Sequence, residues 1–295
     1  MKKKILAFGE IIWDVYPDAA VIGGAPLNFA AHAVRCGAEC ALVSAVGADD
    51  LGARARGELC RFGVGGQYVK TAAKPTGQCL VTLGAGGVPQ YDVLRDVAYD
   101  SVVLSPEDFD AIRAERYDAL YFGTLSSRAP LSRAALHALA DRIAFPEIVC
   151  DVNLRKGCYD AESVRFCLSH ATVLKLSAEE EPLVRQFGFY APAGESPAQV
   201  LRAVCTAFPQ IRTAILTLGP RGAFALERAS GSVCYQPAVG NTVVSTVGAG
   251  DSFTAAFTAA RLGGEPTPAC LARAAQVSGF VVSRLEAVPE YGTDA

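Results

Sequence analysis

The chain has 295 residues, of which 51% are hydrophobic and 19% charged, and its formal net charge is −3. This composition is typical of a globular protein with a sizeable core, and the slightly negative charge argues against a nucleic-acid or anionic-membrane partner. No apolar run approaches the roughly 20 residues of a membrane span, and the apolar stretch after the lysines at 2–4 is too short for a secretory leader. We therefore expect a cytoplasmic protein whose ten cysteines are free thiols rather than a disulfide framework.

Short apolar stretches alternate with helical patterns along the chain. Helices are expected at 26–37, 50–63, 105–116 and 252–264, and strands at 4–12, 40–47, 118–123, 147–153, 172–177 and 213–219. Pro26 suits a first helical turn, Gly37 a helix end, and Ser105 with Asp108 a capping box. Such alternation predicts an α/β fold with a mostly parallel sheet covered on both faces. No linker composition divides the chain, so residues 1–295 are predicted to form one domain.

Two stretches break this alternation. Residues 13–24 are short and rich in turn residues, and residues 77–96 indicate two strands around a Gly/Pro turn. Because such pieces do not easily join a parallel sheet, we expect them to form a small β flap beside it.

The sequence Gly-Ala-Gly-Asp at 248–251 comes directly before the predicted helix 252–264. Glycines allow backbone N–H groups to converge, and the helix dipole favours an anion there, so the loop suits a phosphate. Asp251 could then accept a proton from an attacking hydroxyl. A plain turn followed by a helix cap explains the same residues equally well. Neither a GxxxxGK[ST] nor a GxGxxG motif is present, so the common nucleotide signatures give no support.

Six stretches of the sequence together form a recognisable set: TVGAGDSF (246–253), residues 23–52 beginning GGAPLNFA, and the shorter FGEIIWDVYPD, DVNLR, LKLSAEE and TLGPRGA. With these stretches the sequence resembles the ribokinase-like, PfkB-type carbohydrate kinases, and among them the bacterial fructokinases. The first two are similar to the family's C-terminal and N-terminal signatures, and the four shorter ones follow the family's order. The resemblance therefore covers nearly the whole chain.

The resemblance implies a three-layer α/β/α fold with a small β lid contributed by about residues 10–24 and 75–103. It implies ATP and Mg²⁺ as cofactors, with Asp251 as the catalytic base. Gly248, Ala249 and Gly250 would form the anion hole. The nucleotide would be bound by Ser177, Thr217, Gly219 and Gly222, and Glu180 would organise the magnesium shell through water.

On the sugar side the resemblance implies Asp14, Gly24 and Asn28, with Asn153 and Arg155 as weaker assignments. Simpler roles stay open for several of these residues. Asp14 also suits a turn before Pro17, and Arg155 also suits the solvated surface. Glu180 lies in a run of three glutamates, which is common at a solvated helix start.

Two residues depart from the family pattern. Ser245 stands where relatives usually have an aspartate that helps to hold a monovalent cation, commonly potassium. Glu286 stands where relatives usually have glycine. Because a neutral hydroxyl is a weaker ligand for a hard cation, potassium dependence is left open. One hypothesis is that the Glu286 carboxylate partly replaces the missing one.

Ala25 replaces a lysine that is common in the sugar-phosphate kinases of the family, which favours a neutral sugar, with fructose first. Kinases for ribose or 2-keto-3-deoxygluconate, or a nucleoside kinase, stay open as alternatives. A sugar-sensing protein without turnover is the alternative from another class, although Asp251 and the loop glycines are present. Relatives often dimerise through the lid, and the sequence leaves a homodimer open.

Overall fold

The computed structural model describes residues 2–83, 89–240 and 242–291. Residues 84–88 of the predicted lid stretch 75–103 therefore lie outside the described residues, as do residues 1, 241 and 292–295 of the predicted domain. Over the described residues, no helix is long and apolar enough to cross a membrane. The ten cysteines are free, as the sequence predicts.

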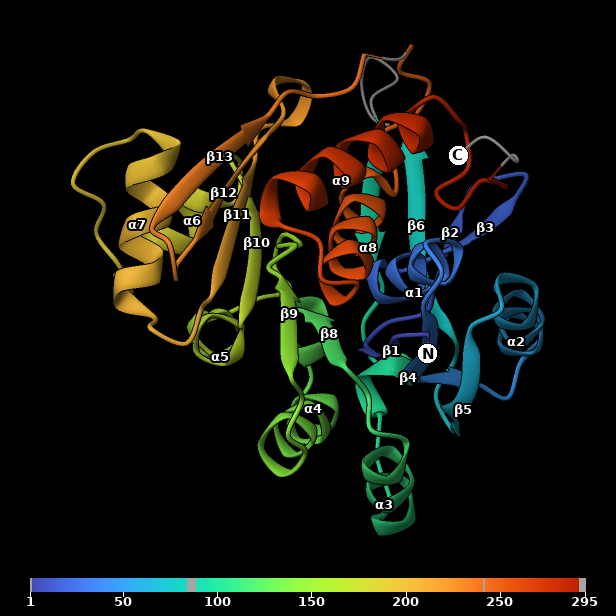
Figure 1. Ribbon diagram of the computed structural model, residues 1–295. Helices are drawn as coiled ribbons and strands as arrows, with labels where there is room; N and C mark the ends of the chain where they lie inside the picture. The colour runs from blue at the N-terminus through green and yellow to red at the C-terminus, as the bar shows by residue number, and fades with distance from the viewer. Residues whose placement is uncertain (1, 84–88, 241, 292–295) are drawn as a thin grey trace.

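The large sheet has nine strands over the described residues (Figure 1). Seven neighbouring strands run parallel, and β12 and β13 add an antiparallel edge. In spatial order the strands are β13 (Ser232–Gln236), β12 (Ala223–Glu227), β11 (Thr213–Thr217), β10 (Val173–Ser177), β9 (Glu147–Asp151), β8 (Ala119–Gly123), β1 (Lys4–Phe8), β4 (Glu39–Gly47) and β5 (Gly65–Ala72).

Helices cover both faces of this sheet, because its strands carry apolar side chains on both sides. In β1, Ile5 and Ala7 contribute to one core cluster, and Leu6 and Phe8 contribute to the other. The first cluster packs under α1 (Ala25–Arg35), α2 (Asp50–Phe62), α8 (Ala249–Leu262) and α9 (Thr267–Val282). The second packs under α3 (Pro106–Glu115), α4 (Pro130–Arg142), α5 (Ala161–His170), α6 (Glu181–Arg185) and α7 (Pro197–Ala207). The predicted three-layer α/β/α fold is therefore confirmed.

The predicted helices and strands are found within a few residues of their expected ends. Ser105 accepts a hydrogen bond from the Asp108 backbone and starts α3, as the capping box predicts. The clearest difference is the stretch 4–12, because the first strand ends at Phe8 and the chain turns at Gly9, where φ is 145°. A second strand, β2 (Ile12–Val15), then begins in another sheet.

That second sheet is small and has four strands over the described residues. Its order is β3 (Ala20–Gly23), β2, β6 (Gly77–Leu83) and β7 (Pro89–Val93). These strands fall within the stretches 10–24 and 75–103, which the resemblance assigns to the lid. Antiparallel pairs join β3 to β2 and β6 to β7, and the central pair β2–β6 is parallel.

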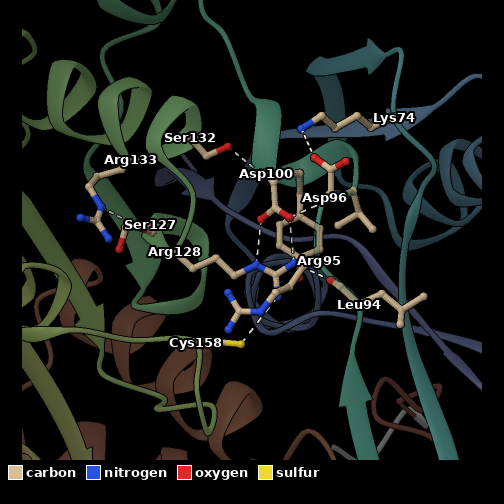
Figure 2. Close-up of polar contacts among 12 residues, drawn as sticks. Lys74, Leu94, Arg95, Asp96, Asp100, Ser127, Arg128, Ser132, Arg133 and Cys158 are labelled. Carbon is tan, nitrogen blue, oxygen red and sulfur yellow. Dashed lines mark hydrogen bonds and ion pairs between the residues drawn. The ribbon is translucent and has the colours of Figure 1, made fainter.

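A buried ion pair connects the segment that follows the small sheet to the turn that follows β8 of the large sheet (Figure 2). The Arg128 guanidinium donates two hydrogen bonds to the Asp100 carboxylate, at 2.8 and 2.9 Å, and a third to the carbonyl oxygen of Leu94 at 2.6 Å. Leu94 follows β7, Asp100 lies in the 3₁₀ turn Ala98–Ser101, and Arg128 follows the 3₁₀ turn Leu125–Ser127 after β8. These contacts therefore hold the end of the small sheet against the carboxyl edge of the large sheet.

Candidate active site

The N-terminus of α8 lies at the carboxyl edge of the parallel strands, where ligands bind in open α/β sheets. Gly248 is its N-cap, with φ of 78°, and a Cβ there would lie 2.5 Å from the carbonyl oxygen of Ala287. Only glycine therefore allows the C-terminal segment to pack this closely on the loop. The first N–H groups of a helix have no partner within the helix, so this end of α8 suits an anion.

Asp251 lies in the first turn of α8 and is 8% exposed. The Asn28 side-chain amide, which belongs to α1, donates a hydrogen bond to Asp251 Oδ2 at 2.8 Å. Burial raises the pKa of Asp251, while that hydrogen bond and the charges of Arg155 and Lys175 act in the opposite direction. The carboxylate is thus held in one orientation, and its raised pKa suits a group that accepts a proton.

A pocket of about 650 Å³ opens on one side of this turn. All four residues that the resemblance assigns to ATP line it: Ser177, Thr217, Gly219 and Gly222. Ala249 and Gly250 of the predicted anion hole line the same pocket, and so do apolar residues of α8 and α9 such as Phe253, Ala275 and Val282. The pocket therefore joins an apolar wall to the N-terminus of a helix, an arrangement that suits a base and its phosphates.

Residues of the small sheet and of the strand ends form a second group, which the charge of Arg155 relates to Asp251. Gly24 precedes α1 with φ of 112°, and a Cβ there would lie 2.5 Å from the carbonyl oxygen of Glu10. Burial raises the pKa of Asp14, on β2, and the positive charge of Arg155 opposes this rise. The same charge acts on Glu10 and Asp251. The charge of Arg155, which is exposed, therefore acts on three carboxyl groups, two of which belong to residues that the resemblance assigns to the site.

Asn153 follows the carboxyl end of β9 and has a φ of 41°, which is uncommon for a residue with a side chain. A Cβ on Gly123, at the end of neighbouring β8, would lie 3.9 Å from the Cβ of Asn153. Asn153 is thus placed at the correct edge of the sheet, and its contacts with Asp14, Asn28 or Asp251 stay a prediction.

Glu180 is held by backbone groups at the ends of two strands. Its carboxylate accepts hydrogen bonds from the N–H groups of Leu154 and Ser177, both at 2.8 Å. The neighbouring Glu179 lines the pocket. Among the described residues, no group of three or more His, Cys, Asp or Glu side chains could hold a metal ion. Glu179 and Glu180 suit a Mg²⁺ ion whose ligands are mainly water and phosphate oxygens. They suit an ion enclosed by protein ligands less well.

The two departures from the family pattern lie beside the same loop. Ser245 Oγ accepts a hydrogen bond from the Val247 N–H group at 3.2 Å. Glu286 is exposed and directly precedes Ala287, whose carbonyl oxygen packs on Gly248. That the Glu286 carboxylate partly replaces the carboxylate missing at position 245 stays a hypothesis.

Sequence reasoning missed two buried charges in this region, Lys175 on β10 and Asp151 at the end of β9. Their side chains form an ion pair at 2.9 Å. Both belong to quoted motifs, LKLSAEE and DVNLR. The available signal was a lysine inside an apolar strand pattern, which is expensive to bury without a partner.

The fold and this site define a class of α/β protein with a glycine-capped helix end that suits an anion and a small second β sheet, and comparisons with known proteins identify the family. Residues 4–290 match the family model described as "pfkB family carbohydrate kinase". The chain therefore belongs to the pfkB family of carbohydrate kinases.

Individual relatives are more distant. A fructokinase of Klebsiella pneumoniae is 28% identical over 272 residues, covering 88% of this chain and 84% of the relative. A fructoselysine 6-kinase of Shigella flexneri is 27% identical over 273 residues, covering 92% and 94%. The solved structure of a fructokinase with bound ATP from Xylella fastidiosa superimposes with a TM-score of 0.81 at 21% identity, covering 98% of this chain and 94% of that one. The structural likeness supports the ribokinase-like fold.

Proposed function

We propose that this chain transfers the γ-phosphoryl group of ATP to a hydroxyl of a neutral ketose, with fructose as the first choice. The observation that carries the proposal is the position of Asp251. Its carboxylate is oriented by Asn28 and directly follows Gly250, which lines the pocket, and the positive charge of Arg155 acts on both Asp251 and Asp14. The fructokinase relatives and the ATP in the Xylella fastidiosa structure support the choice of substrates.

The residues divide the reaction among them. Bound ATP would supply the phosphoryl group, with Mg²⁺ to neutralise its charge. Asp251 accepts the proton of the attacking sugar hydroxyl as the new O–P bond forms. The bond from phosphorus to the bridging oxygen then breaks, and ADP carries away its electron pair. The N-terminus of α8 stabilises the charge on the phosphoryl oxygens throughout.

The charge balance of the sugar side favours a neutral substrate. The positive charge of Arg155 acts on the carboxyl groups of Asp14, Glu10 and Asp251, and these groups reduce its attraction for an added anion. This argues against a sugar acid or a sugar phosphate. The same carboxyl groups would favour a ketose that carries an ammonium group, as in the substrate named for the Shigella flexneri relative. Such a ketose is our second candidate.

The test is ADP release with MgATP over fructose, ribose, 2-keto-3-deoxygluconate and fructoselysine, with and without potassium. We expect fructose to give the highest kcat/KM and the Asp251→Asn variant to lower kcat by about 100-fold or more. Asp110→Asn, an exposed change on α3, is the matched control and should retain activity. Turnover by Asp251→Asn at the wild-type rate would contradict the assignment of the base. A sugar that raises the melting temperature without being phosphorylated would instead favour a sugar-sensing protein.

A further inference from the structure

Lys175 is a buried charge in the middle of a core strand. It is the third residue of β10, and its side chain is 8% exposed. Its ammonium lies 2.9 Å from Asp151 Oδ1, and Asp151 is its register partner on β9. Thr254 Oγ1, on α8, lies 3.1 Å from the second oxygen of Asp151 and 2.8 Å from the carbonyl oxygen of Gly250, so its one hydrogen is shared between them. Strand β9 and helix α8 together fix where the ammonium points.

The ammonium points toward the loop that starts α8. A Cβ built on Gly250 would lie 3.3 Å from Lys175 Nζ, so nitrogen and loop are nearly in contact. Lys175 also lines the 650 Å³ pocket. Of the described residues that line this pocket, Lys175 is the one with a cationic side chain, and Glu179 adds a negative charge. A pocket for a polyphosphate needs positive charge, and this lysine is in the place to supply it.

The surrounding charges keep the lysine protonated. Burial by itself lowers the pKa of Lys175, but the carboxylates of Asp151 and Glu180 outweigh it and raise the pKa above its ordinary value. An ammonium has three donors. The hydrogen bond to Asp151 uses one of them, so the group retains donors for a ligand in the pocket.

We propose that Lys175 is a phosphate-binding residue of this pocket, whose ammonium contacts the terminal phosphates of the bound nucleotide while Asp151 and Thr254 hold it beside Gly250. This inference rests on the proposed function, because it assigns the pocket to ATP. An ion pair that only stabilised the core would not need to lie next to both the start of α8 and the pocket. The phosphate-binding role accounts for both positions.

The test compares nucleotides that differ only in their phosphates. Lys175→Met alone would leave Asp151 as an unpaired buried charge, so the main variant is Lys175→Met/Asp151→Asn, which removes both charges with little change of volume. A second Lys–Asp pair, Lys70 with Asp108 at 2.6 Å, lies on β5 and α3, and Lys70→Met/Asp108→Asn is the matched control. Binding of ATP, ADP, AMP and adenosine is measured by calorimetry without sugar, and kcat and both KM values are measured with fructose.

We expect the Lys175→Met/Asp151→Asn variant to weaken ATP and ADP by about tenfold or more and to leave adenosine unchanged. The KM for ATP should rise while the KM for fructose stays near the wild-type value. The inference is wrong if ATP and adenosine weaken equally, or if neither changes. A wild-type chain that binds ATP but phosphorylates no sugar would overturn the proposed function, and the comparison of ATP with adenosine would still decide the role of Lys175. A wild-type chain that binds no adenine nucleotide would overturn both.

Discussion

Two buried titratable side chains beside the site have pKa shifts in opposite directions. Burial raises the pKa of Glu10 to about 7, although its Oε1 accepts a hydrogen bond from the Ala25 N–H group. Burial lowers the pKa of His32 to about 4. His32 Nε2 lies 2.9 Å from the Ala287 carbonyl oxygen, which can only accept, so Nε2 donates. Neutral His32 thus holds the segment that packs on Gly248.

The shift of Glu10 predicts a pH-dependent stability. Because its folded pKa lies above its ordinary value of 4.5, the folded state loses stability as pH rises from about 4.5 to about 7. Glu10→Gln removes this cost. We expect urea denaturation to give Glu10→Gln a higher free energy of unfolding than the wild type. The difference should be small at pH 5 and about 3 kcal/mol at pH 8. Glu195→Gln, whose side chain is 89% exposed, is the control and should give no such trend. An equal difference at both pH values would contradict the buried charge.

At the scale of elements, the buried guanidinium of Arg128 connects the end of the small sheet to the large sheet (Figure 2). The side chains of Arg128 and Asp100 are 3% and 6% exposed. The guanidinium also lies over the Tyr99 ring, with its carbon 4.8 Å from the ring centroid. This arrangement connects the turn after β7 with the turn after β8, so it fixes the lid stretch relative to the carboxyl edge where Asp251 lies.

Arg128→Met should therefore destabilise the fold by about 3–5 kcal/mol, because it leaves the Asp100 carboxylate buried without its partner. The double variant Arg128→Met/Asp100→Asn should recover part of that loss. Denaturant titration with both variants is the measurement. The exposed pair Arg113–Asp110 on α3 offers the contrast, and Arg113→Met should cost at most about 1 kcal/mol. If both arginine variants lose the same stability, the guanidinium has no special role in the fold.

At the scale of the whole molecule, the two sheets have different surroundings. Helices cover the nine-stranded sheet on both faces, whereas the small sheet leaves Val21 and Leu80 exposed, at 46% and 37%. Its outer strands over the described residues are β3 and β7, and sheet edges offer backbone groups to a partner. These features are compatible with a homodimer through the lid, which the sequence leaves open.

We expect sedimentation velocity to show a dimer at micromolar concentration. Leu80→Lys should shift it toward monomer, because burying an ammonium in an apolar contact is costly. Leu131→Lys is the control, since Leu131 is 54% exposed on α4 and does not belong to the small sheet. A wild-type chain that is monomeric at every concentration would show that the lid does not mediate dimerisation.

Much of this fold was predictable because its elements are encoded locally. The apolar strand patterns, Pro26 and Gly37 around α1, and the Ser105–Asp108 capping box each act over a few residues. The prediction failed at 4–12, where the apolar pattern continues through Gly9 although the chain changes sheets there. Periodicity reports that a strand is buried, but it does not report which sheet receives it.

The sequence by itself determined the α/β class, the positions of most helices and strands, and the glycine loop with Asp251 directly after it. Only the tertiary structure decided which distant side chains meet. Asn28 and Asp251 are 223 residues apart, and Lys175 and Asp151 pair only because β9 and β10 align in one register. The physical reason is that a charge or an amide has no local pattern of its own. Its partner is chosen by how strands align and helices pack, and those contacts complete the site.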